Sequence, residues 1–171
     1  AAVRRHEGLP LEVVPVVGAV PEEIEVVEHG IRYRAAPHHG QKTGAFLDQR
    51  ENRVLIGAHT RPGGRALDVF TYHGSFALHL ARPAAEVVAV DQSAEALARG
   101  ADNARLNGIG NIAWREANAF DWLRELERRK ERFDTIVLDP PAFAKTKATL
   151  PRAVAGYKEI NLRAMRILAP E

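Results

Sequence analysis

Short apolar stretches alternate with amphipathic ones from Arg65 almost to the end of the chain, and this alternation constrains the fold more than any other feature. The expected strands are residues 66–70, 87–90, 112–115 and 133–138, and the expected helices are near residues 76–80, 94–106, 120–129 and 152–168. Strands that alternate with helices form a parallel sheet with helices on both faces. The strands are almost continuously apolar, which is typical of strands buried on both sides. The sequence therefore predicts an α/β fold.

The first forty residues differ from the rest, because they are rich in Val, Pro and Glu. Residues 23–28 and 31–35 are expected to form two strands around a turn at His29-Gly30. We therefore expect two domains, a small β appendage or linker domain over residues 1–40 and the α/β domain over residues 41–171, which begins with a helix near residues 48–58. A fifth strand is expected where the sequence stops, so this α/β domain is predicted to be truncated.

The composition excludes several classes of site. The 171 residues contain no cysteine, so disulfides, thiolate nucleophiles and cysteine-bound zinc are excluded within the chain. No apolar run approaches the roughly 20 residues that cross a bilayer, so we expect no membrane partner. The formal net charge is only +2, unlike that of a general nucleic-acid binder. Residues 141–171 nevertheless hold six basic and two acidic side chains, which form either a phosphate-binding face or a solvated helix face.

Acidic residues stand at the ends of the first two expected strands. Asp68 ends the first strand before Gly74 opens a helix, and Asp91 ends the second strand. Ligands of open α/β sheets bind beyond the carboxyl ends of the strands, where a glycine lets the backbone approach closely and a carboxylate can accept ribose hydroxyls. Each feature alone is equally compatible with an ordinary turn. The single glycine lacks the fingerprint of NAD or FAD sites, and no phosphate-binding P-loop occurs.

Two further stretches follow the third and fourth strands. After the third strand, Asn118 could bond an adenine edge and Phe120 could pack on the adenine face. Alternatively, Asn118 could cap the helix and Phe120 could belong to the core. After the fourth comes Asp139-Pro140-Pro141-Ala142-Phe143-Ala144-Lys145. Two prolines fix the backbone and remove two amide donors, so such a loop aims its carbonyls and Asp139 at one point. A planar nucleobase suits that point, and Phe143 could stack on it.

Together these residues resemble a known family. The stretches that carry the resemblance are Gln41-Lys42-Thr43-Gly44, Phe46-Leu47-Asp48-Gln49-Arg50, Asp68-Val69-Phe70, Asp91 and the Asp139–Lys145 loop. They resemble the bacterial large-subunit ribosomal RNA cytosine-C5 methyltransferases, which belong to the class I S-adenosylmethionine-dependent enzymes. The resemblance covers about residues 4–171, and the Gln-Lys-Thr-Gly and Asp-Pro-Pro-Ala-Phe stretches are its most specific parts.

The resemblance implies a Rossmann-like sheet, S-adenosyl-L-methionine as cofactor and RNA, in particular 23S rRNA, as partner. It also implies a cytoplasmic enzyme, with a homodimer as one assembly to consider. The residues that it places at the cofactor are Lys42, Asp68, Phe70, Gly74, Asp91, Gln92, Ser93, Asn118 and Ala119, and those at the target base are Asp139, Pro140, Pro141 and Phe143. Within these sets, Asp68, Phe70 and Gly74 line the methionine part, Asp91 holds the ribose, and Gln92, Asn118 and Ala119 lie near the adenine.

Two departures from the family pattern keep other functions open. Nothing here corresponds to the family's RNA-binding PUA domain, and its nucleophilic cysteine would lie beyond Glu171. Methylation of cytosine C5 needs covalent attack at C6, so the alternatives are methylation of a base nitrogen such as guanine N7, or a non-catalytic fragment that binds cofactor or RNA. A small-molecule or protein methyltransferase is a third reading. No metal site is expected, because adjacent histidines such as His38-His39 rarely bind one ion.

Overall fold

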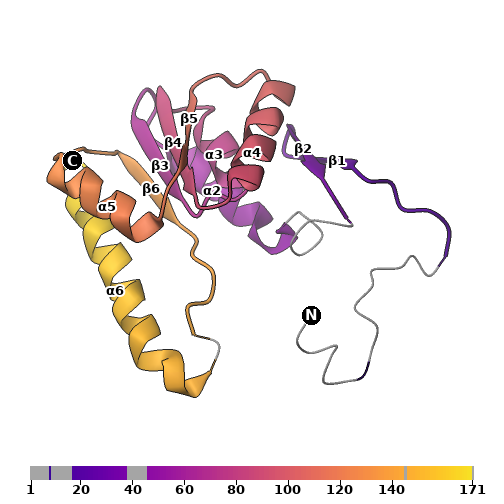
Figure 1. Ribbon diagram of the computed structural model, residues 1–171. Coiled ribbons are helices and arrows are strands. Elements are labelled where there is room, and N and C mark those ends of the chain that lie inside the picture. The colour runs from indigo at the N-terminus through magenta and orange to yellow at the C-terminus, as the bar shows by residue number, and fades with distance from the viewer. Residues whose placement is uncertain (1–7, 9–16, 38–45, 145, 171) are drawn as a thin grey trace.

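The computed structural model describes residues 8, 17–37, 46–144 and 146–170, and a parallel four-stranded sheet lies at its centre (Figure 1). The strands are β3 (Arg65–Val69), β4 (Glu86–Asp91), β5 (Ile112–Glu116) and β6 (Thr135–Leu138). Their order is β5-β4-β3-β6, so the chain moves outward from β3 to β5 and then crosses back to the other side of β3. The predicted α/β fold is therefore confirmed.

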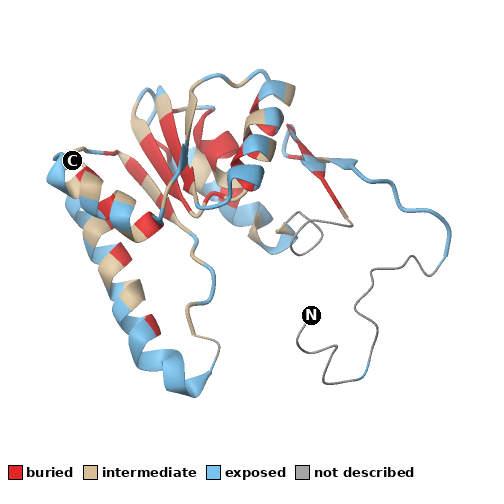
Figure 2. Ribbon diagram, viewed as in Figure 1, coloured by how far each residue is buried: buried red, intermediate tan, exposed pale blue. Residues whose placement is uncertain are grey.

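Helices cover both faces of this sheet. They are α2 (Arg50–His59), α3 (Ser75–Leu80), α4 (Ala94–Leu106), α5 (Ala119–Arg128) and α6 (Leu150–Ile167), and short 3-10 helices at Leu47–Gln49 and Lys147–Thr149 precede α2 and α6. Because side chains alternate along a strand, Leu67 and Val69 pack with Leu123 of α5 and Ile160 of α6, while Ala66 belongs to the cluster that includes residues of α3. Figure 2 shows the buried residues along the strands and on the inner sides of the helices. Among the described helices, none combines the length and apolarity needed to span a membrane.

Side-chain caps explain where two helices begin. The Ser93 hydroxyl accepts a hydrogen bond from Ala96 N at 3.2 Å, so α4 starts at Ala94 as expected. Helix α6 begins at Leu150, two residues before the expected position, because Pro151 lies in its first turn. Proline is tolerated there, since the first amides of a helix have no partner within the helix.

Strand β6 begins at Thr135, two residues later than expected, although Asp134 N still donates to Arg65 O of β3 at 2.8 Å. The Asp134 carboxylate accepts the backbone N–H of Arg65 at 2.8 Å and Arg61 Nη1 at 2.9 Å. Phe133 instead forms an isolated parallel bridge with Leu168, in which Phe133 N donates to Ile167 O at 3.0 Å and Ala169 N donates to Phe133 O at 2.9 Å. The chain thus returns beside β6 at the place where a fifth strand was expected, and the truncation of this domain stays a prediction.

The strands β1 (Ile24–Glu28) and β2 (Ile31–Ala35) form an antiparallel hairpin that is fastened to α4. Asn103 Oδ1 accepts Arg34 N at 2.9 Å. Asn107 accepts Arg32 N through Oδ1 at 2.8 Å and donates to Arg32 O through Nδ2 at 2.7 Å. The two asparagines therefore bond the free edge of β2 as a third strand would. The proposed domain boundary at residue 40 stays a prediction.

A buried ion pair makes the second attachment of the hairpin. Arg53 of α2 donates to Glu28 through Nε at 2.8 Å and Nη2 at 2.6 Å, and the two side chains are only 3% and 4% exposed. Burial raises the pKa of Glu28, but the hydrogen bonds and charge of Arg53, with the charges of His79 and Arg50, together outweigh burial and hold this pKa below its ordinary value. His79 lies 3.6 Å from Glu28, and burial lowers the His79 pKa to about 4. The sequence analysis did not single out these three residues.

Arg53→Leu should strongly destabilise the fold, because it leaves the Glu28 carboxylate buried without its cation. Removal of one partner of a buried pair costs about 3–5 kcal/mol. The measurement is the free energy of unfolding in urea. The control is Arg32→Ala, which breaks the solvent-exposed pair with Glu25 and should cause a much smaller loss. Equal losses for the two variants would contradict the role given to the buried pair.

Candidate functional site

The carboxyl ends of three adjacent strands meet at one edge of the sheet. Val69 is the last paired residue of β3, level with Val90 of β4 and with Leu138 of β6. The residues that follow, Phe70, Asp91 and Asp139, therefore start from the same level. The connections after β3 and β6 leave in opposite directions, and a crevice for ligands forms at such a reversal in open α/β sheets.

Asp68 lies beneath this edge and is 1% exposed. Its Oδ2 accepts the Thr71 hydroxyl at 2.5 Å and Ala77 N at 2.9 Å, whereas its buried Oδ1 has no hydrogen-bond partner. Burial, together with the charges of Asp139 and Asp91, raises the Asp68 pKa to about 7 against the effect of these two bonds. Asp68 therefore fixes the turn into α3 and contributes to a crowded group of three carboxylates.

The turn between β3 and α3 holds two strained residues. Phe70 and Tyr72 have φ angles of 68° and 52°, in the left-handed region that side chains disfavour. The amides of Phe70 and Thr71 both donate to Val90 O, at 2.9 Å and 3.0 Å. Strain of this kind costs about 1–3 kcal/mol for each residue and is concentrated at functional sites.

The structure shows a reason for glycine at position 74 that the sequence did not reveal. Its φ is 82°, and a Cβ at this position would lie 2.4 Å from Cη2 of Trp114. A Cβ on Gly100 of α4 would lie 2.5 Å from Cζ3 of the same indole. The ring of Trp114 is thus packed against both glycines, so the close approach seen at Gly74 is to Trp114. Contact between Gly74 and a cofactor stays a prediction.

Asp91 is held in place by two backbone amides. Its Oδ2 accepts Tyr72 N at 2.9 Å and its Oδ1 accepts Ser93 N at 3.0 Å. A carboxylate oxygen has more than one acceptor position, so each oxygen can still accept a hydroxyl. The Asp91 side chain is half-buried, whereas Gln92 and Ser93 beside it are exposed, and the Ser93 hydroxyl is used as the cap of α4.

Asn118 acts as the cap of α5, one of the two roles considered for it. Its Oδ1 accepts Phe120 N at 3.0 Å and Asp121 N at 3.3 Å, which leaves the amide nitrogen to donate to a ligand. Ala119 is buried, so its side chain packs into the protein. Phe120 packs against the core cluster and against Phe143, at 5.7 Å between ring centroids.

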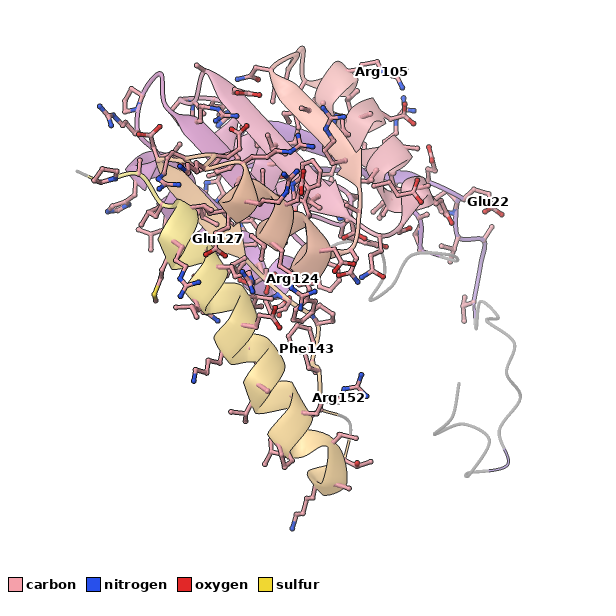
Figure 3. The ribbon with its side chains drawn as sticks, turned by 60° about the vertical axis from the view of Figure 1, so that its left-hand side comes forward. Glu22, Arg105, Arg124, Glu127, Phe143 and Arg152 are labelled. Atoms are coloured by element: carbon pink, nitrogen blue, oxygen red, sulfur yellow. The ribbon has the colours of Figure 1, made fainter. Side chains whose placement is uncertain are left out.

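The loop after β6 exposes its acidic end, whereas its aromatic end packs against other rings of the chain. Asp139 and Pro141 are exposed, and Pro140 and Phe143 are half-buried. Figure 3 shows Phe143 where this loop runs beside α6. The Phe143 ring contacts three rings of the same chain, those of Phe70, Phe120 and Tyr157. The Phe143 ring thus already has partners within the chain. Its stacking on a base stays a prediction.

Several predicted residues lie outside the described residues. They are Lys42 with the rest of the Gln-Lys-Thr-Gly stretch, Lys145, and the pair His38-His39. Within the described part, no group of three or more His, Asp or Glu side chains is arranged to hold a metal ion. The sequence analysis did not assign the contributions of Thr71 and Tyr72, which their position next to Gly74 could have indicated.

Comparison with other sequences gives a match over nearly the whole chain. The model of the S-adenosylmethionine-dependent methyltransferase family matches residues 6–171. Ribosomal RNA large subunit methyltransferase I of Aeromonas salmonicida is 42% identical over 173 residues, which cover 99% of this chain and 43% of that protein. The protein of the same name from Escherichia coli is 38% identical over 171 residues, which cover 98% of this chain and 43% of that protein. The chain thus spans less than half the length of these relatives.

Solved structures share the fold. One structure complexed with S-adenosylhomocysteine matches with a TM-score of 0.77 and 26% identity, over 90% of this chain and 41% of that chain. The S-adenosylmethionine-dependent methyltransferase from Agrobacterium tumefaciens matches with a TM-score of 0.74 and 24% identity, over 90% of this chain and 51% of that chain. The second similarity is evidence for the fold alone.

Asp68→Asn should change how stability depends on pH. The folded-state pKa of about 7 lies above the ordinary value of 3.8, so the folded protein binds this proton more tightly and the wild type loses stability as pH rises from about 4 to 7. Asparagine keeps an acceptor for Thr71 and Ala77 and carries no charge. Between pH 5 and pH 7, the free energy of unfolding of the variant should therefore rise relative to that of the wild type, by at most about 1.4 kcal/mol per pH unit.

Urea unfolding of both proteins at a series of pH values measures this difference. A difference that stays constant over this pH range would show that Asp68 is already ionised in the folded protein.

Proposed function

The chain belongs to the S-adenosylmethionine-dependent methyltransferase family, and from this premise we propose that it holds the cofactor and base sites of an enzyme that methylates a base of large-subunit ribosomal RNA. The observation that carries the proposal is the common edge at which Asp91 and the Asp139-Pro140-Pro141 loop follow neighbouring strands on either side of β3. The RNA substrate is taken from the names of the relatives, which are ribosomal RNA large subunit methyltransferases.

The charge of the site fits S-adenosylmethionine. Asp68, Asp91 and Asp139 are close enough that the last two raise the pKa of the first, and Asp68 Oδ1 is buried without a partner. A guest that carries a sulfonium and an ammonium group would relieve this repulsion, because opposite charges at short range favour the ionised carboxylates. When bound, S-adenosylmethionine supplies an electrophilic methyl group, so the protein contributes mainly orientation.

We assign the cofactor contacts by position. Asp91, held by Tyr72 N and Ser93 N, would accept the ribose hydroxyls, and the strained turn from Phe70 to Gly74 would border the methionine part. The amide nitrogen of Asn118 would donate to the adenine, with Gln92, Ser93 and the backbone of Ala119 beside it. Lys42 is assigned to the cofactor only by the family resemblance.

We assign the target base to the loop after β6. Pro140 and Pro141 fix its backbone, so that Asp139 and the loop carbonyls point in constant directions toward a flipped base. Asp139 would orient the base through its amino group and could take up a proton released there. Phe143 completes this set at the half-buried, aromatic end of the loop.

The target atom that we propose is cytosine C5. Carbon C5 becomes nucleophilic only after a nucleophile has added to C6. The 171 residues contain no cysteine, so we assign to them the binding and orientation of base and cofactor, without the attacking thiolate. A base nitrogen such as guanine N7 needs no such attack, and this makes it the second candidate.

Asp91→Ala should weaken the binding of S-adenosylhomocysteine about 10- to 100-fold, because hydrogen bonds to a charged group contribute roughly 1.5–3 kcal/mol. Calorimetric titration measures the affinity, and thermal unfolding shows whether the variant is folded. The matched control is Glu86→Ala at the opposite end of β4, where the side chain pairs with Arg65, and its affinity should stay within about twofold of wild type. Equal affinities for Asp91→Ala and wild type would remove Asp91 from the ribose site.

The full-length protein should transfer a labelled methyl group to deproteinised large-subunit rRNA, and digestion should yield 5-methylcytidine. Labelled 7-methylguanosine would favour the second candidate. Labelled protein with unlabelled RNA would exclude an RNA substrate, and binding of S-adenosylhomocysteine without any transfer would indicate a non-catalytic binding role.

A further inference from the structure

We infer that the Tyr157 side chain on α6 is a positioning group that fixes the Asp139–Phe143 loop against the cofactor turn. This inference rests on the proposed function, in which the loop receives the target base. Neither the motifs of the sequence nor the comparisons assign a role to Tyr157.

The loop depends on other parts of the chain to fix it. Pro140 and Pro141 have no N–H, so few amides remain between Asp139 and Phe143 that could anchor the backbone. The Phe143 amide donates to the Tyr157 hydroxyl at 3.2 Å. The same hydroxyl lies 3.5 Å from Pro141 O, where it can donate a weak hydrogen bond. One hydroxyl therefore contacts the backbone at two positions that flank Ala142.

The ring of Phe143 lies in an aromatic socket made by Phe70, Phe120, Gly156 and Tyr157. It stacks on Tyr157 with centroids 4.5 Å apart and planes 27° apart, and it lies 6.2 Å from Phe70. A Cβ on Gly156 would lie 3.3 Å from Phe143 Cδ2, so the absence of a side chain there lets the ring approach the helix. Offset or tilted aromatic pairs contribute about 0.5–1.5 kcal/mol beyond their buried area.

Helix α6 is itself fixed against the rest of the fold, so it can hold the loop in place. Ile160, Ala164 and Ile167 are buried against the sheet and α5. Three ion pairs join it to α5: Glu159 with Arg124 at 2.6 Å, Arg166 with Glu127 at 2.8 Å, and Arg163 with Glu127. Figure 3 shows Arg124 and Glu127 where α5 faces α6. Contacts from Tyr157 thus fix the loop relative to the sheet.

The socket also joins the two proposed sites. Phe70 follows β3 in the turn assigned to the cofactor, and Phe143 follows Asp139 in the loop assigned to the base. Loss of the Tyr157 hydroxyl would free the base loop without removing any atom from the cofactor turn. The expected signature is therefore a loss in the rate of transfer, with cofactor affinity unchanged.

Tyr157→Phe in the full-length protein tests this inference, because it removes the hydroxyl and keeps the stacked ring. Hydrogen exchange of the Phe143 amide should become roughly tenfold faster, the effect of losing one hydrogen bond of about 1.4 kcal/mol. The kcat for methyl transfer to large-subunit rRNA should fall about three- to tenfold, and the affinity for S-adenosylhomocysteine should stay within about twofold. The matched control is Tyr33→Phe, which removes a buried hydroxyl that has no hydrogen-bond partner and should leave all three quantities unchanged.

The outcomes separate this inference from the function on which it rests. Unchanged exchange at Phe143 and an unchanged kcat in Tyr157→Phe would overturn the inference while leaving the function intact. A parallel loss of cofactor affinity would also overturn it, since the hydroxyl would then act on the whole site. If the wild type binds S-adenosylhomocysteine but transfers no methyl group to RNA, the proposed function fails first and the inference fails with it.

Discussion

The parallel pairing of β3 with two neighbours is the constraint on which the rest of the structure depends. Val69 is level with Val90 on one side and with Leu138 on the other, so three chain segments leave the sheet together. A shift of one residue in either pairing would turn every side chain of that strand to the opposite face. The buried clusters on the two faces prevent such a shift, because Leu67 and Val69 pack toward α5 and α6 while Ala66 packs toward α3. Core packing thus determines where Asp91 and Asp139 emerge.

This arrangement brings like charges together. Asp68, Asp91 and Asp139 arise from three neighbouring strands, and their mutual repulsion adds to the effect of burial in raising the Asp68 pKa. A protein selected for stability alone would gain by separating them. The repulsion is useful if the site receives a cation, because the guest then supplies the charge that the protein lacks. The buried pair of Glu28 and Arg53 shows the opposite solution, in which the protein itself provides the compensating charge.

The sequence predicted those features that depend on neighbouring residues. The four strands and their helices follow from hydrophobic periodicity, and the start of α4 follows from the cap at Ser93. Features that depend on distant residues were not predicted. Phe133 forms an isolated bridge with Leu168, and the hairpin is held by Asn103 and Asn107, more than 60 residues away along the chain. At the candidate site, the acidic residues were found because they lie at or next to the ends of strands, whereas the role of Tyr157 depends on where α6 packs.

The strained turn links this geometry to the proposed cofactor site. Phe70 and Tyr72 adopt left-handed backbone conformations, which are unfavourable for residues with side chains. The strain is offset by specific bonds, since the amides of Phe70 and Thr71 reach Val90 O and the amide of Tyr72 reaches Asp91 Oδ2. The left-handed turn therefore also orients the Asp91 carboxylate. Because Phe70 in turn contacts Phe143, the strain in one turn affects the positions of both the carboxylate proposed to bind the ribose and the loop proposed to hold the base.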